Sequence, residues 1–234
     1  PNSVTYVCAL GACGDLRAVN KGQELYMRIV KEGYDGDSIM GNSLVDMYAR
    51  CGYLAEAEYG FYKLPEQDII SYSALIAGYA ELGLCKEALN SLRRMRSDGI
   101  IPDEITFVSI LKACGIRRNI CRGKETHAKI VKEGFLQNDI LVATALMDMY
   151  CKCGELTGAR EVFDGFPLRD VVMWTALIAG YVENKHVKEA FDGFNRIECE
   201  SLCANAFTLS CTLKACGNIR AIDTGKRIHM RVIE

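Results

Sequence analysis

Cysteine and histidine are the residues of this chain that could hold a metal ion or supply a nucleophile and a base. The chain contains 12 Cys and 3 His among its 234 residues. A zinc site normally includes a close pair such as C-x₂-C or H-x₃-H, and neither spacing occurs in the sequence. The H-x-E and P-C-x-x-C elements of a zinc deaminase are also missing from these residues. We therefore expect no metal, no cofactor and no catalytic residue. This chain should not itself be an enzyme, although a catalytic domain could follow in a longer protein.

Internal repeats indicate which elements position the remaining side chains. DMYARCGYLAEAE (46–58) returns as DMYCKCGELTGAR (148–160), SYSALIAGYAELGLCKEAL (71–89) as MWTALIAGYVENKHVKEAF (173–191), and FVSILKACG (107–115) as LSCTLKACG (209–217). The copies lie ~100 residues apart, so the chain consists of larger units of ~100 residues. Each of these units divides into three repeats of roughly 31–36 residues, a period typical of helix-turn-helix solenoids. We expect one solenoid over 1–234, with repeats at 3–37, 38–68, 69–103, 104–139, 140–170 and 171–205 and a truncated repeat at 206–234.

Each repeat carries the pattern of two short helices. In repeat 69–103, apolar residues from Ile70 to Ala80 form the face of a first helix, Gly83 interrupts it, and a stripe from Ala88 to Met95 marks a second helix. We therefore expect an all-α fold with helices of roughly 12–14 residues. The twentieth position of every repeat holds a small residue that would allow close helix approach: Gly22, Ala57, Ala88, Gly123, Ala159, Ala190 and Gly225.

The cysteines follow the same repeat. Cys13, Cys114 and Cys216 occupy one repeat position, and Cys51 and Cys153 occupy another, so we expect them to be apolar packing residues. A stack of such repeats buries its core between neighbours and offers a long concave surface lined by first helices. That surface would suit an extended ligand, such as a peptide, a partner helix or a nucleic-acid strand.

The sequence motifs and the alternating lengths of the repeats resemble those of the pentatricopeptide repeat (PPR) family, in particular its plant PLS subclass of long (L), short (S) and standard (P) repeats. The phrases that carry the resemblance are NSLVDMYARCG, DIISYSALIAGY, EITFVSILKACG and VVMWTALIAGY. On this resemblance 3–37 and 104–139 are L, 38–68 and 140–170 are S, 69–103 and 171–205 are P, and 206–234 is a truncated L. The tetratricopeptide pattern does not fit, because the single Trp174 is not followed by Leu-Gly. The resemblance implies a right-handed α-solenoid that binds single-stranded RNA, one nucleotide per repeat.

In that family the fifth and last residues of a repeat read the base edge, and the second residue sandwiches the base. Carried over to this chain, the base-reading pairs are Val7 and Asp37, Asn42 and Asp68, Ser73 and Asp103, Val108 and Asp139, Thr144 and Asp170, and Thr175 and Asn205, with Ser210 in the truncated repeat. The sandwiching residues are Val4, Ile39, Ile70, Ile105, Leu141, Val172 and Phe207.

Each of these residue types also has a purely structural explanation. An Asp or Asn just before a helix is a good N-cap, and an apolar second residue can belong to the core. Ser, Thr or Asn at the fifth position is a poor helix former, but its hydroxyl or amide can hydrogen-bond a base edge. An apolar second residue can likewise stack on any base. Taken together, the pairs of fifth and last residues favour recognition of RNA bases.

Under the family's code, Asn42 with Asp68 implies U, Ser73 with Asp103 and Thr144 with Asp170 imply G, and Thr175 with Asn205 implies A. The pairs that contain Val7 and Val108 fall on L repeats and are left unassigned. The resemblance therefore implies the ligand 5′-nUGnGA-3′.

The net charge of −2 is unusual for a nucleic-acid binder, because phosphate contacts supply much of the affinity. Basic residues gather in 112–132 and 214–231, where they would form either a partner-docking face or a solvated one. At the thirteenth position, where the family often has a phosphate-binding Lys, Arg50 and Lys152 fit, whereas Glu81 and Glu183 do not. We expect weak to moderate RNA affinity, a shallow salt dependence and help from a protein partner.

The resemblance implies the targeting array of an RNA editing or processing factor in a mitochondrion or chloroplast. It also implies that L repeats dock small accessory editing-factor proteins. The alternative is a protein-interaction solenoid that binds a peptide or an accessory factor without reading RNA. The sequence contains no apolar stretch near the ~20 residues that a membrane span needs, and we interpret the chain as a fragment of a longer protein.

Overall fold

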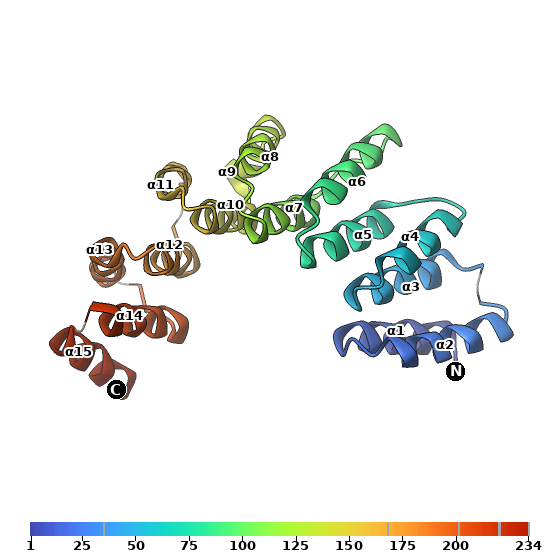
Figure 1. The fold of residues 1–234 in the computed structure, drawn as a ribbon, viewed down its shortest axis with the longest axis horizontal. Helices are drawn as coiled ribbons and strands as arrows, with labels where there is room; N and C mark the ends of the chain where they lie inside the picture. Colours follow the sequence, from blue (N-terminus) through green and yellow to red (C-terminus); the bar gives the residue numbers. More distant parts are fainter. Residues whose placement is uncertain (35, 168, 201, 220, 234) are drawn as a thin grey trace. The chain divides into compact units, whose positions relative to one another are not determined.

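The computed structural model describes residues 1–34, 36–167, 169–200, 202–219 and 221–233. Across these residues the backbone forms helices and turns and contains no strand. The chain divides into two compact halves, Pro1–Arg117 and Arg118–Glu234, and each half consists mainly of paired helices (Figure 1). The expected all-α class built from helix-turn-helix repeats is therefore confirmed.

In the N-terminal half, four first helices lie on one another in succession: α1 (Ser3–Asp15), α3 (Ser38–Arg50), α5 (Ile69–Glu81) and α7 (Glu104–Ile116). The second helices are α2 (Val19–Lys31), α4 (Leu54–Lys63) and α6 (Cys85–Ser97). Each second helix packs against the first helix of its own pair and against the first helix of the next pair (Figure 1). The core of this half therefore lies between neighbouring repeats.

The C-terminal half repeats this arrangement with first helices α10 (Ile140–Lys152), α12 (Val171–Glu183) and α14 (Ala206–Ile219). Its second helices are α8 (Ile120–Lys132), α11 (Leu156–Gly165), α13 (Val187–Cys199) and α15 (Ile222–Ile233). A single extra turn, α9 (Phe135–Asn138), lies between α8 and α10 and contacts both. All first helices begin at the residues where repeats are expected to start, whereas the division into L, S and P repeats stays a prediction.

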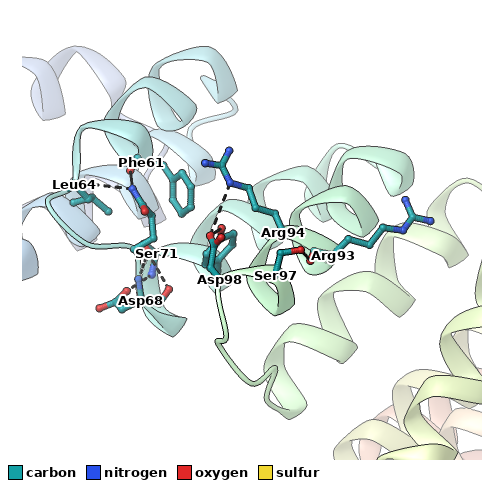
Figure 2. Close-up of polar contacts among 10 residues, drawn as sticks. Phe61, Leu64, Asp68, Ser71, Arg93, Arg94, Ser97 and Asp98 are labelled. Atoms are coloured by element: carbon teal, nitrogen blue, oxygen red, sulfur yellow. Dashed lines mark hydrogen bonds and ion pairs between the residues drawn. The ribbon is translucent and has the colours of Figure 1, made fainter.

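The first helices begin where they do because an acid or amide caps each of them. Asp37, Asp68, Asp103, Asp139 and Asp170 each accept a hydrogen bond from a backbone N–H of the first turn. These bonds satisfy amide groups that have no partner within the helix. Figure 2 shows the most complete example, in which the Asp68 side chain accepts from the Ser71 amide at 2.8 Å and Ser71 Oγ accepts from the Asp68 amide at 3.0 Å.

The turn between paired helices needs a left-handed residue. Gly52, Gly83 and Gly154 adopt φ values of 82°, 67° and 79° there, a region that is open to glycine and costly for other residues. Arg17, Arg118 and Lys185 hold the same turn position with φ of 52°, 50° and 65°. The geometry is thus conserved between repeats even where glycine is missing.

Close helix contacts explain several small residues. A Cβ added at Gly22 or Gly123 would lie 2.5 Å or 2.3 Å from the sulfur of Met47 or Met149, respectively, on the first helix of the following pair. The small twentieth residue therefore faces the next repeat. Cys13, Cys114 and Cys216 are buried, as expected for packing residues. Within the described part of the chain, no group of three or more potential metal ligands gathers and no helix is long and apolar enough to span a membrane.

Candidate nucleic-acid interface

The second residue of each repeat lies on the surface. Val4, Ile39, Ile70, Ile105, Leu141, Val172 and Phe207 are 50–66% exposed. The alternative that they belong to the core is wrong, and Ile70 does not share the buried face that contains Leu75 and Ile76. A set of apolar side chains that stays in solvent at the same point of every first helix provides flat surface for a planar ligand.

In the N-terminal half these apolar residues flank a groove of about 510 Å³. The groove is lined by Ile39, Ile70 and Ile105, and by the expected base-reading residues Asn42, Asp68, Ser73 and Asp103. They come together because α3, α5 and α7 lie side by side and present equivalent positions to one face. The structure therefore brings two reading pairs and three second-position residues into one groove.

Asn42 and Asp68 contact each other directly. The Asn42 Nδ2 donates to Asp68 Oδ2 at 2.9 Å, while Oδ1 of the same carboxylate caps α5. Partial burial by itself would raise the pKa of Asp68, but the hydrogen bonds from the Ser71 amide and from Asn42 stabilise the carboxylate and hold this pKa below its ordinary value. Asn42 is buried, and its Oδ1 has no hydrogen-bond partner among the described residues.

Ser73 and Asp103 are joined through a third residue. Thr106 donates its Oγ1 hydrogen to Asp103 Oδ1 at 2.7 Å, and Ser73 Oγ lies 3.2 Å from Thr106 Oγ1. The Thr106 backbone amide also donates to Asp103 Oδ1, at 2.8 Å. Thr106 is fully buried, so the connection between Ser73 and Asp103 is shielded from water.

The same arrangement recurs in the C-terminal half at Thr175 and Asn205. Thr208 donates from its amide and its hydroxyl to Asn205 Oδ1, at 2.8 Å and 2.9 Å. The hydroxyl oxygens of Thr175 and Thr208 are 2.5 Å apart. Both threonines are buried. Because Asn205 accepts through Oδ1, its Nδ2 group is oriented as a donor on the other side of the amide.

The remaining expected residues are not joined in this way. Thr144 donates to the carbonyl of Ile140 at 2.7 Å, and Asp170 accepts from the amide of Met173 at 2.9 Å. Asp37 and Asp139 cap α3 and α10, respectively, and Ser210 lies exposed on α14. Val7 and Val108 are partly exposed. Val108 belongs to the N-terminal half and Asp139 to the C-terminal half.

Carboxylates already bind the cations at the thirteenth position of α3 and α10. Arg50 donates from Nε to Asp46 at 3.0 Å and from Nη1 to Asp15 at 2.5 Å, and these contacts, chiefly the one to Asp46, raise its pKa. Lys152 contacts Asp148 at 2.7 Å. A phosphate would have to compete with those carboxylates for either cation.

The basic segments are partly neutralised as well. Lys112 contacts Glu81 at 2.5 Å, Arg122 contacts Glu125 at 2.8 Å, and Lys124 contacts Glu155 at 3.4 Å. In the segment 214–231, Arg220 lies outside the described residues, as do the side chains of Arg227 and Arg231. The two alternatives for these segments, a partner-docking face and a solvated one, both stay predictions.

Sequence reasoning missed the bridging threonines. The signal was present, because the third residue of repeats 3–37, 104–139 and 206–234 is Thr5, Thr106 and Thr208. All three make the same pair of hydrogen bonds to the residue that precedes the repeat, Asn2, Asp103 and Asn205. In repeats 69–103 and 171–205 the third position holds Ser71 and Met173 instead.

Comparison with known families and proteins agrees with the fold. A model described as "PPR repeat family" matches residues 67–115 and 169–218, and a "PPR repeat" model matches 42–69 and 142–169. The chain is 35% identical over 229 residues to the Arabidopsis thaliana pentatricopeptide repeat-containing protein At4g18520, chloroplastic, covering 98% of this chain and 37% of that protein. It is 36% identical over 229 residues to the putative mitochondrial protein At3g13770 of the same plant, covering 97% and 36%.

This chain thus spans about a third of the length of the curated relatives it matches. Among solved structures, its fold is similar to maize PPR10 crystallised in complex with an 18-nt psaJ RNA element, with a TM-score of 0.50 and 16% identity. That match covers 100% of this chain and 45% of PPR10.

Proposed function

This chain belongs to the pentatricopeptide repeat family, and from that membership we propose that it binds single-stranded RNA, one base per repeat, along its first helices. The observation that carries the proposal is the groove in which Asn42, Ser73 and their acidic partners lie between exposed apolar side chains. Such a groove supplies both parts of single-strand recognition: surface that stacks on a base and polar atoms that hydrogen-bond its edge.

The orientation of Asn42 supports U at its repeat. Because a carboxylate only accepts hydrogen bonds, Asp68 takes the Nδ2 donor of Asn42 and leaves Oδ1 as the acceptor. The N3–H of uracil is a donor that would satisfy this oxygen, which has no partner among the described residues. Leaving a buried acceptor unpaired costs about 1–3 kcal/mol, so a matching base would restore a bond that the free protein lacks.

The other pairs support G, G and A. In the pairs of Ser73 with Asp103 and of Thr144 with Asp170, the hydroxyl and the carboxylate both present oxygen acceptors. Two acceptors suit the N1–H and N2 amino donors of guanine. Asn205 instead presents an amide donor beside Thr175, which suits the N1 acceptor of adenine. The proposed ligand is 5′-nUGnGA-3′, with the positions of Val7 and Val108 unassigned.

In this proposal the chain is the non-catalytic targeting part of an RNA editing or processing factor of the PLS subclass. The relatives named chloroplastic and mitochondrial support an organellar location. Arg50 and Lys152 are held by carboxylates, which supports modest affinity for phosphate and the participation of an accessory protein.

The alternative function is protein binding without RNA reading. An apolar cavity of about 460 Å³ between α2 and α4, lined by Tyr26, Leu44, Tyr59 and Pro65, favours it, because this cavity is large enough for side chains of a partner. The first helix α3 also lines this cavity through Leu44, as does its N-cap Asp37, an expected base-reading residue, so a partner bound there would compete with RNA at Asp37.

A titration separates the two functions. Fluorescently labelled nUGnGA RNA and a scrambled oligomer of the same composition are titrated with the chain at low salt, and binding is followed by anisotropy. The proposal predicts tighter binding of nUGnGA. Equal binding of both oligomers, or binding of neither, would contradict sequence-specific reading and leave the protein-binding function.

A further inference from the structure

We propose that Thr106 is a positioning residue for the base read by the repeat before it, so that each base at such a junction is recognised by three residues rather than two. The inference rests on the proposed RNA reading and extends it. The residues concerned are Thr106 and Thr208, the third residues of repeats 104–139 and 206–234. Each would set whether the fifth residue of the repeat before it, Ser73 or Thr175, accepts or donates a hydrogen bond to the base.

The hydrogen atoms in the chain Ser73–Thr106–Asp103 have only one consistent arrangement. An ionised carboxylate has no hydrogen to donate, so the single hydroxyl hydrogen of Thr106 is given to Asp103 at 2.7 Å. The contact of 3.2 Å between Ser73 and Thr106 then requires Ser73 to be the donor. With its own hydrogen committed, the Ser73 oxygen can only accept from a base.

This order of donors has a direct consequence for base choice. Guanine presents N1–H and the N2 amino group, which donate to an acceptor, whereas adenine presents N1 as an acceptor and would meet another acceptor. Without Thr106, the Ser73 hydroxyl could rotate and donate to adenine N1. Thr106 therefore keeps Ser73 selective although it does not lie in the groove itself, being fully buried.

A second instance occurs at Thr208, which bonds Asn205 and contacts Thr175 at 2.5 Å. Thr175 has one hydrogen and two acceptors within reach, Thr208 Oγ1 and the Val171 carbonyl at 2.5 Å, so its oxygen is again an acceptor. The donor at that junction comes from Asn205. At this junction Thr208 and the Val171 carbonyl together keep the fifth residue an acceptor, and the last residue, Asp or Asn, decides whether a donor is available.

The chain contains a matched control. Thr5 makes the same two bonds to Asn2, at 3.0 Å from its amide and 2.7 Å from its hydroxyl, but within the described residues its hydroxyl bonds no fifth-position side chain. Replacing Thr5 by Val removes the same hydroxyl contact to a helix cap as replacing Thr106, without touching a base-reading residue. Because Thr5 is exposed whereas Thr106 is fully buried, the stability of each variant is measured separately, and their effects on RNA are compared between folded proteins.

The test measures the ratio of affinities for two oligomers that carry G or A opposite repeat 69–103. The wild-type chain should prefer G. Thr106→Val should reduce that preference about threefold to tenfold, the effect of one hydrogen bond, while Thr106→Ser and Thr5→Val should keep it. Thr106→Ala removes the same hydroxyl with a smaller side chain and should behave as Thr106→Val does if the valine variant does not fold.

Failure of this inference and failure of RNA reading give different results. A wild-type chain that prefers G, with Thr106→Val or Thr106→Ala preferring G equally, would overturn the role of Thr106 alone. A loss of preference in Thr5→Val as large as in Thr106→Val would also overturn it, because the effect would then be general. A wild-type chain without any preference between G and A would overturn the proposed reading at this repeat, and the inference with it.

Discussion

Asn42 on α3 donates its side-chain amide to Asp68, the residue that caps α5, at 2.9 Å. One carboxylate thereby performs two tasks, since Oδ1 holds the first turn of the next helix and Oδ2 orients the amide that faces the groove. The stacking of first helices thus sets the orientation of the side chain that would meet a base. Helix capping and the proposed base recognition therefore depend on the same carboxylate.

Close packing of first helices should make Gly78 intolerant of a side chain. A Cβ at Gly78 on α5 would lie 2.7 Å from the Cβ and 3.2 Å from the Cα of Ala49 on α3, and neither atom can rotate away. We expect Gly78→Ala to lower the free energy of unfolding by about 1–3 kcal/mol, the usual cost of overpacking, as measured by urea denaturation.

Gly11 on α1 is the control for that substitution. A Cβ there would meet nothing within 4 Å, so Gly11→Ala should be neutral or should stabilise the protein by up to ~1 kcal/mol through helix propensity. Equal effects of the two substitutions would show that the α3–α5 contact does not limit residue size.

Much of this architecture could be predicted from the sequence, because capping and packing leave local signals. Asp37 and Asp68 precede apolar segments at a fixed spacing, and small residues such as Gly22 recur where helices meet. The exposure of Ile70 was not predictable by the same means, since an apolar residue in a helical pattern usually indicates core. The role of Thr106 depends on contacts across two helices, which a single repeat read alone does not contain.

The exposed second residues should contribute to RNA affinity without contributing to stability. Ile70 is 61% exposed, so Ile70→Ser should leave the melting temperature unchanged. If Ile70 stacks on a base, the same substitution should weaken RNA binding about fivefold to tenfold, in line with ~1 kcal/mol or more per stacked base, for all sequences alike.

Ile101 is the matched control for Ile70. It is 80% exposed in the segment before α7 and does not line the groove. Anisotropy titrations should show no loss of affinity for Ile101→Ser. A similar loss in both variants would mean that exposed apolar area in general, rather than the second position, carries the effect.

Releasing Arg50 from its carboxylate should make RNA binding more dependent on salt. Asp46 holds Arg50 through Nε and Asp15 holds it through Nη1, so Asp46→Asn leaves only Asp15 to compete with a phosphate for this guanidinium. We expect tighter binding at low salt and a slope of log K against log salt that is steeper by about 0.7, the value for one phosphate contact with a single strand.

Asp164→Asn provides the control, because it makes the same change in net charge and frees Arg160 from an equivalent pair on α11. That pair lies on a second helix, so the slope should stay at its wild-type value. An unchanged slope in Asp46→Asn would instead place the RNA backbone away from Arg50.

His127 should make the stability of the C-terminal half depend on pH. Its Nδ1 lies 2.8 Å from the Tyr150 hydroxyl, and burial lowers the pKa of His127 although the charge of Glu161 opposes this. A lowered pKa in the folded protein means that the stabilisation is complete above the ordinary value of ~6.5 and is lost as the pH falls through the folded value.

Tyr26 occupies the position equivalent to His127 in the preceding copy, so His127→Tyr is a fitting replacement. Urea denaturation between pH 7 and pH 5 should show a smaller loss of unfolding free energy for His127→Tyr than for the wild-type chain. Parallel curves for the two proteins would contradict the assignment, since His127 is the only histidine that differs between them.

The most direct test of the account is a change of base preference by a single substitution. The affinity of the wild-type chain and of Asn42→Thr is measured for oligomers that carry U or G opposite repeat 38–68. Thr with Asp is the pair that this chain already has at Thr144 and Asp170. We expect the wild-type chain to prefer U and Asn42→Thr to prefer G. A variant that still prefers U, or a pair of proteins that bind both oligomers equally, would contradict this expectation.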